Sequence, residues 1–168
     1  MNTNFPGQIQ VQMAKAGWFK RSYRFIADDK IIGQLDYEKS YGNKAKGSIN
    51  GQEFSIRRTG FWKHFIEINS ASDQYNTRIG INWRNQMKIM DSASNPFVFK
   101  HTGIWKNKWQ WFDRYERSLI EIRSKNLSRK NRGLIEVTDP AMEDPLFWII
   151  VSWFVIICSE SDAAAAAG

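Results

Sequence analysis

The sequence predicts a mainly β protein, an antiparallel barrel or sandwich, with one hydrophobic helix near its C-terminal end. Residues 9–137 form short β-rich segments separated by turn residues, without a 3.6-residue apolar stripe long enough for a surface helix. Residues 146–158, LFWIIVSWFVIIC, are apolar except for Ser152. A helix that is apolar on all sides must be enclosed by protein or by lipid.

The strand segments follow from runs of β-branched and aromatic residues. We predict about twelve strands, at residues 9–13, 18–27, 30–38, 45–50, 52–58, 61–69, 76–84, 86–91, 96–102, 104–112, 117–124 and 133–138. Alternation supports them: Ile79, Ile81 and Trp83 share one face, and Ile120 and Ile122 alternate with charged residues. Each strand then has one buried and one solvated face.

Three connections carry turn signals. Asn50-Gly51 indicates a hairpin, because a type I′ turn needs the positive φ that Asn and Gly tolerate. The pairs Asp28-Asp29 and Arg84-Asn85 are expected to make similar tight reversals. Gly33, Gly80 and Gly103 lie within or between strands, where bulges and bends are the expected use.

The apolar run begins with a helix start signal. Asp144 stands as an N-cap before Pro145 at the first helical position, which predicts a helix over residues 145–158. The run 146–158 would be about 20 Å long, whereas a hydrocarbon core of about 30 Å needs about 20 residues. A helix buried in protein is therefore favoured over a membrane span, although a buried strand also fits this composition. Residues 159–168 are expected to form a mobile, Ala-rich tail.

Composition predicts one soluble domain over residues 1–158. The 168 residues include eight Trp and eleven Phe, which supply large core side chains. The net charge of +7, from 24 basic and 17 acidic residues, favours anionic partners such as phospholipid headgroups or nucleic acid. The single cysteine, Cys158, excludes an intrachain disulfide and a multi-cysteine zinc site. Without a secretory or transit signal pattern, the cytoplasm is the expected location.

Four spaced blocks carry a family resemblance: YRFIADDKIIGQL, INGQEFSIRRTGFWK, WKNKWQWFD and LFWIIVSWFVIICSESDAAAAAG. Together with strands followed by one apolar helix, they resemble the tubby C-terminal domain and phospholipid scramblase superfamily, in particular its uncharacterised bacterial members. The resemblance implies a closed barrel of about twelve strands around a central helix. Tubby domains are associated with phosphoinositides and scramblases with lipid movement and calcium. The chain lacks a calcium loop of the D-x-[DN]-x-[DN]-G type, so scramblase activity is not expected.

Basic residues form the candidate binding groups. They are Arg123, Lys125, Arg129, Lys130 and Arg132 in one connection, Arg57, Arg58 and Lys63 around a turn, and Lys100, Lys106 and Lys108 across a hairpin. Near an anionic membrane each contributes about 1 kcal/mol. The alternative, favoured by how charge runs usually behave, is a solvated surface.

The aromatic residues, the histidines and the cysteine give weaker indications of a binding or catalytic site. Trp105, Trp109 and Trp111 alternate along one segment and would form either a stacking platform for sugars or bases or, as favoured here, part of the core. His64 and His101 lack neighbours at catalytic or metal-ligand spacing, and no nucleotide loop motif occurs. Burial of Cys158 would raise its thiol pKa and make it a core residue.

These observations favour a non-enzymatic binding or scaffold module without a cofactor, which contacts anionic phospholipid by family analogy and carries no specific nucleic-acid signal. Two alternatives stay open: a protein anchored in the membrane through residues 146–158, and a carrier with a small-ligand pocket at a barrel mouth.

Overall fold

The computed structural model describes residues 5–16, 20–39, 42–60, 63–72, 74–103, 107–124 and 130–168. Its strands are β1 (Gln8–Ala16), β2 (Lys20–Ala27), β3 (Lys30–Tyr37), β4 (Lys44–Ile49), β5 (Gln52–Thr59), β6 (His64–Ser70), β7 (Thr77–Ile81), β8 (Met87–Met90), β9 (Pro96–His101), β10 (Lys108–Phe112), β11 (Ser118–Ser124) and β12 (Asn131–Val137). The helix α1 spans Pro145–Ala167.

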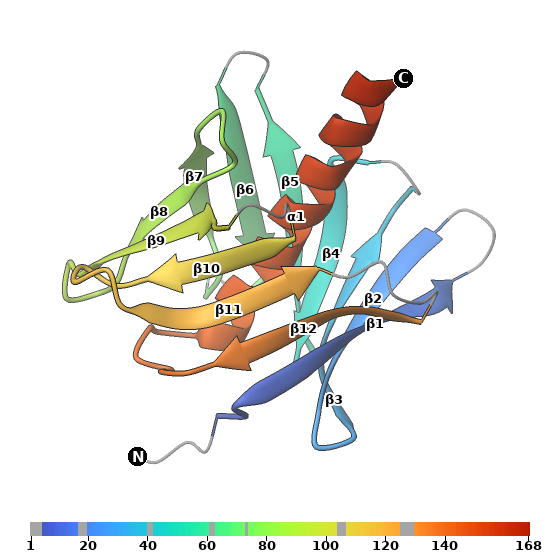
Figure 1. Ribbon diagram of the computed structural model, residues 1–168. Coiled ribbons are helices and arrows are strands. Elements are labelled where there is room, and N and C mark those ends of the chain that lie inside the picture. The colour runs from blue at the N-terminus through green and yellow to red at the C-terminus, as the bar shows by residue number, and fades with distance from the viewer. Residues whose placement is uncertain are drawn as a thin grey trace.

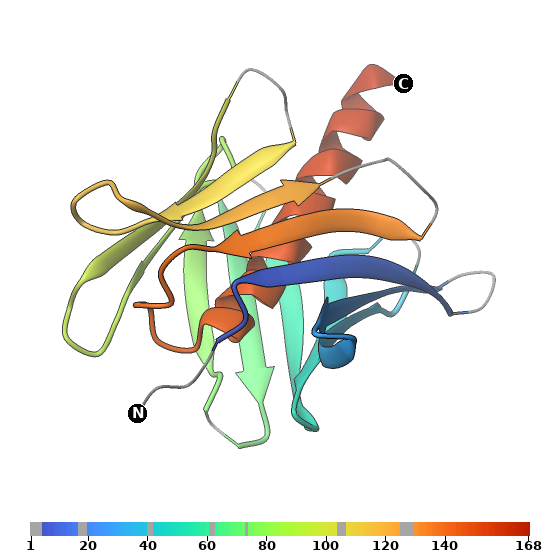
Figure 2. The same ribbon diagram turned by 60° about the horizontal axis from the view of Figure 1, so that its bottom comes forward.

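The strands form one closed antiparallel barrel in which each strand pairs with its neighbours in the chain and β12 closes on β1. The helix α1 runs through the barrel (Figure 1), and its last turns extend beyond the sheet (Figure 2). The predicted closed barrel around a central helix is therefore confirmed, and the buried-strand alternative for residues 146–158 is wrong.

Buried side chains, which alternate with solvated ones along the strands, fill the space between the barrel and the helix. In β11, Ile120 and Ile122 are buried while Glu121 and Arg123 between and beside them are not. Along α1, Phe147 and every residue from Ile149 to Cys158 are buried. Because apolar residues surround the helix on all sides, no face of this segment is left for solvent.

Aromatic contacts join the helix to several strands. The rings of Phe154 and Tyr37 are stacked with centroids 5.7 Å apart, and Tyr75 stacks on Phe147 at 4.4 Å. Trp153 meets Tyr23 edge to face at 5.7 Å. Such pairs contribute about 0.5–1.5 kcal/mol each beyond the area that they bury.

One buried hydrogen bond explains the polar break in the apolar run. The indole Nε1 of Trp111 donates to Ser152 Oγ at 2.8 Å, and that hydroxyl donates to the carbonyl of Trp148 at 2.6 Å. Both Trp111 and Ser152 are fully buried. Ser152 thus satisfies an indole N–H that has no access to water.

We expect Ser152→Ala to lower the free energy of unfolding by about 1–3 kcal/mol, because the Trp111 indole then loses its acceptor inside the core. Urea unfolding followed by Trp fluorescence measures this loss. The same substitution in a Trp111→Phe background should cost less, since that ring has no N–H to satisfy. Equal costs in the two backgrounds would show that the bond contributes nothing to stability.

The turn predictions are partly confirmed. Asp28 and Asp29 have φ of 48° and 60°, and Asn50 and Gly51 have φ of 50° and 80°, as two-residue reversals with both central residues at positive φ require. The predicted two-residue reversal at Arg84-Asn85 is wrong, because a different type of turn forms there.

The connection from β7 to β8 is instead a longer turn organised by Asn82. The backbone N–H of Asn85 donates to the carbonyl of Asn82 at 2.9 Å, and only Asn85 among the turn residues has positive φ, at 57°. The Asn82 side chain accepts from the N–H groups of Arg84 and Gln86. This side-chain turn ends β7 at Ile81, so Trp83 leaves the face that Ile79 and Ile81 share and is 81% exposed.

Both ends of the helix differ from expectation in one respect. The helix starts at Pro145 as predicted, but Asp144 has a left-handed backbone and makes no capping hydrogen bond with its side chain. At the other end, the helix does not stop at Cys158, and residues predicted as a tail continue it to Ala167. The Ala run explains this extension, because Ala has the highest intrinsic helix propensity.

Candidate functional site

The two ends of the barrel differ in charge. We call the end from which the C-terminal turns of α1 emerge the helix-exit end, and the opposite one the far end (Figure 1). In the described residues, basic side chains on the connections and strand ends of the helix-exit end include Arg21, Lys39, Lys44, Arg58, Lys63, Arg84, Lys88, Lys100, Lys108, Arg123, Lys130 and Arg132. Acidic residues there include Asp36, Glu38, Glu160 and Asp162.

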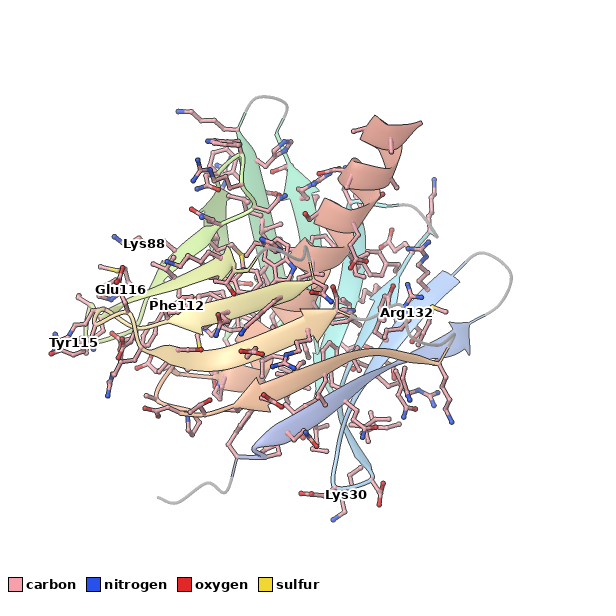
Figure 3. The ribbon with its side chains drawn as sticks, in the orientation of Figure 1. Lys30, Lys88, Phe112, Tyr115, Glu116 and Arg132 are labelled. Carbon is pink, nitrogen blue, oxygen red and sulfur yellow. The ribbon has the colours of Figure 1, made fainter. Side chains whose placement is uncertain are left out.

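The far end has the opposite character. Its described connections and strand ends carry the acidic residues Asp28, Asp29, Glu53, Asp91, Asp113, Glu116, Glu136, Asp139, Glu143 and Asp144, and the basic residues Lys30, Arg78, Arg114 and Arg117. Figure 3 shows Arg132 near the start of β12 on the right and Glu116 at the left-hand tip of the β10–β11 connection. This separation also suits the helix dipole, whose negative end lies among the basic residues.

The predicted basic residues are distributed over this arrangement unevenly. Arg123 is exposed on β11 and pairs with Glu121 at 2.6 Å. Lys130 is exposed and Arg132 half-buried at the helix-exit end. Lys125 and Arg129 lie outside the described residues, as do Lys106 and Trp105.

Arg57 and Arg58 were grouped in the sequence, but they point to opposite faces of β5. Arg57 is exposed and its Nε donates to Glu67 at 3.0 Å. Arg58 is turned toward the helix, where its two terminal nitrogens donate to the carboxylate of Asp162 at 2.6 and 2.8 Å. The side chain of Arg58 is only 11% exposed, whereas that of Asp162 is 50% exposed. The structure thus makes Arg58 part of a cavity and Arg57 part of the outer wall.

That cavity has a volume of about 320 Å³ and lies beside the helix at its exit. It is lined by Arg21, Tyr37, Asn43, Arg58, Cys158 and Asp162, among others. Of these residues, Arg58 was predicted as a binding candidate and Cys158 as a core residue, whereas the others were not predicted as site residues. They come from β2, from β3, from the connection to β4 and from the helix extension, so no local motif joins them.

We call this cavity the mouth pocket. Tyr37 is its residue with a buried hydroxyl. It is 3% exposed, and its hydroxyl has no hydrogen-bond partner among the described residues. Burial raises the pKa of Tyr37 well above its ordinary value, so the phenol is a neutral hydrogen-bond donor at neutral pH. A buried hydroxyl left without a partner is rare in folded proteins and indicates a place for water or a ligand atom.

Basic side chains act on a second buried phenol close by. Burial raises the pKa of Tyr23, and the positive charges of Arg21 and Arg132 oppose that rise. Arg21 and Arg132 are thus the basic residues whose charge acts on this phenol. Arg21 and Arg58 both line the cavity beside the helix exit, and Arg132 is the second residue of β12.

Other buried polar atoms also gather toward this end. In the described part of the chain, His64 Nδ1, His101 Nε2, Trp109 Nε1 and Trp153 Nε1 are buried without a hydrogen-bond partner. His64 begins β6, His101 ends β9 and Trp109 is the second residue of β10, all at the helix-exit end. Among the described residues, more buried polar atoms therefore lack a hydrogen-bond partner at this end than at the far end.

The remaining sequence leads are resolved as core or turn residues. Trp109 and Trp111 are 4% and 0% exposed, so they form core rather than a stacking platform. Burial raises the pKa of Cys158 to about 12, which leaves the thiol protonated and unreactive at neutral pH. Gly103 has φ of 95° in a turn, while Gly33 borders a bulge and lets Ile150 approach.

The helix α1 is long and apolar enough to cross a membrane by length and composition, although most of its apolar part is buried inside the barrel. In comparisons with known proteins, the chain matches no family model, no curated protein and no solved structure.

Proposed function

We propose that this chain is a non-catalytic binding module that places the helix-exit end of its barrel on an anionic phospholipid surface. The observation that carries the proposal is the position of Trp83. This indole is 81% exposed on the β7–β8 connection, at the basic end of the barrel, with the guanidinium of Arg84 4.5 Å from its ring centre. Trp favours the membrane–water interface, and basic side chains are attracted to anionic headgroups.

The turn that carries Trp83 is fixed to the helix exit. Asn85 Nδ2 donates to Ser159 Oγ at 3.1 Å, at the point where α1 leaves the barrel. Trp83, Arg84 and the emerging helix thus belong to one surface, to which Lys63 and Lys130 add exposed charge. An acidic far end would be repelled by the same membrane, which favours one orientation.

The proposal includes kinship with the tubby-like and scramblase-like superfamily and a peripheral cytoplasmic location. A closed barrel with a central helix is the architecture that the resemblance implies, which supports this kinship. Burial of residues 147 and 149–158 by the chain's own strands favours peripheral contact over insertion of α1 into the bilayer.

Sedimentation with vesicles tests this function. The full chain should pellet with vesicles of phosphatidylcholine and phosphatidylserine and stay in solution with phosphatidylcholine alone. Trp83→Ser should weaken binding by about tenfold, since it removes the aromatic anchor. Replacing Arg84 and Lys130 by Gln should weaken binding by more, at about fivefold for each lost charge.

The far end supplies matched controls. Tyr115 is 64% exposed there and also carries an arginine against its ring, so Tyr115→Ser removes a similar aromatic group from the wrong end. Lys30→Gln with Arg114→Gln removes the same charge from that end. Equal losses from the two ends would rule out the proposed orientation, and equal pelleting with and without phosphatidylserine would rule out the function.

A further inference from the structure

We infer that the mouth pocket between β2, β3, β5 and α1 binds a phosphate monoester group, and that Asp162 occupies the binding fork of Arg58 until such a group displaces it. The mouth pocket lies beside the helix, and ligand binding there is independent of the membrane contact proposed above. Such binding adds a ligand class and a form of self-inhibition to the same end of the barrel.

The donors of the pocket suit a phosphate. Arg21, Tyr37, Asn43 and Arg58 all line it, and the buried Tyr37 hydroxyl has no hydrogen-bond partner among the described residues. A guanidinium binds a phosphate or a carboxylate through two parallel hydrogen bonds. A phosphate monoester offers nearly two negative charges and three acceptor oxygens, enough for two guanidinium groups and one phenol. The volume of about 320 Å³ accommodates a small organic phosphate.

Asp162 already shows how an anion binds here. Its carboxylate accepts from both terminal nitrogens of Arg58, and the pairing lowers the pKa of Asp162 so that it stays ionised. Arg58 is nearly buried and needs an anionic partner, whereas Asp162 belongs to the exposed helix extension and remains half exposed. Loss of Arg58 as a partner therefore costs Asp162 little, because water can solvate its carboxylate.

The exposed helix end gives this exchange a physical route. The residues after Ser159 are all exposed, and the pair between Asp162 and Arg58 of β5 is a hydrogen-bonded contact that joins them to a strand. Helix ends fray in the absence of tertiary contacts. Unwinding of the last turns carries Asp162 away from Arg58 and opens the fork to a ligand, without disturbing the part of α1 that fills the barrel.

Isothermal titration calorimetry of the full chain with sn-glycerol 3-phosphate tests the inference. Asp162→Asn should bind this probe about fivefold more tightly than the parent chain, since the internal competitor is gone. Arg58→Gln should abolish binding, and Tyr37→Phe should weaken it about fivefold through loss of one donor. Thermal unfolding of each variant establishes that it is folded.

Glu116→Gln is the matched control, because it removes one negative charge at the far end. If it strengthens binding as much as Asp162→Asn, general electrostatics and not displacement explains the effect, and the inference is wrong. Absence of binding in Asp162→Asn also overturns it. This pair keeps the test decisive even if Arg58→Gln does not fold.

Vesicles separate the two sources of the phosphate. Phosphatidic acid carries a phosphate monoester, whereas phosphatidylserine carries a diester. Preference for phosphatidic acid that is lost in Arg58→Gln identifies a lipid headgroup as the source, and binding of glycerol 3-phosphate without that preference identifies a free organic phosphate. If neither is seen while Trp83-dependent binding to phosphatidylserine persists, the pocket inference fails and the proposed surface function stands.

Discussion

Replacing Ile150 by Asp is expected to prevent the barrel from folding. Ile150 lies in the middle of the buried part of α1, is fully inaccessible to solvent, and packs against β3 at Gly33. None of the buried side chains among the described residues is basic, so an ionised carboxylate would be buried without a partner. Such a charge costs several kcal/mol or more, a large part of the about 5–15 kcal/mol that stabilises a typical domain. Near-UV circular dichroism, which reports on fixed aromatic packing, should lose its signal.

The same substitution further along the helix provides the control. Ala164 belongs to α1 but lies beyond the barrel and is exposed, so Ala164→Asp should change the unfolding free energy by no more than about 0.5 kcal/mol. A folded Ile150→Asp variant with the stability of Ala164→Asp would mean that α1 is not enclosed by the strands.

The fold could be predicted from sequence because its main signals are local. Alternation of buried and solvated side chains marks strands such as β11, and an apolar run introduced by Asp144 and Pro145 marks the helix start. Closure of the sheet was implied by the family resemblance and not by these patterns, since alternation fits a sandwich equally well.

The sequence predictions were wrong at two places. At one a polar side chain ends a strand early, and at the other the intrinsic helix propensity of Ala extends the helix. The Asn82 side chain ends β7 early and exposes Trp83, although the alternation pattern continues through that residue. The helix extends past Cys158 because Ala-rich sequence favours helix even without a buried face. Both signals were present in the sequence, as an Asn at a strand end and as five consecutive alanines, but periodicity does not report them.

The mouth pocket could not be predicted from the sequence in this way. Arg58 and Asp162 are 104 positions apart, and Arg21 and Tyr37 come from two further strands. They meet only because the barrel closes and the helix leaves it beside β3, β4 and β5. A charge pattern can identify Arg57 and Arg58 as a basic pair, but the strand geometry assigns one to the wall and one to the pocket.

Gly133→Val is the second substitution for which we expect a large effect, a loss of about 3 kcal/mol in unfolding free energy. A Cβ atom at Gly133 would lie 2.6 Å from Cη2 of Trp153 and 2.8 Å from the carbonyl oxygen of Arg123. The first obstacle is the indole that fills the centre of the barrel, and the second is backbone of β11. Since neither has room to move in a packed interior, the added side chain forces strain.

Two further variants show whether this clash is the cause. Gly80 in β7 has open space at its Cβ position, so Gly80→Val should leave stability unchanged or raise it, as Val favours strands more than Gly does. In a Trp153→Phe background, where the outer indole ring is absent, Gly133→Val should cost at least about 1 kcal/mol less than in the parent chain. Part of the cost should persist, because the Arg123 carbonyl remains. Guanidinium unfolding of the four variants measures this coupling, and strictly additive losses would show that the β12 wall and the helix do not meet at Gly133.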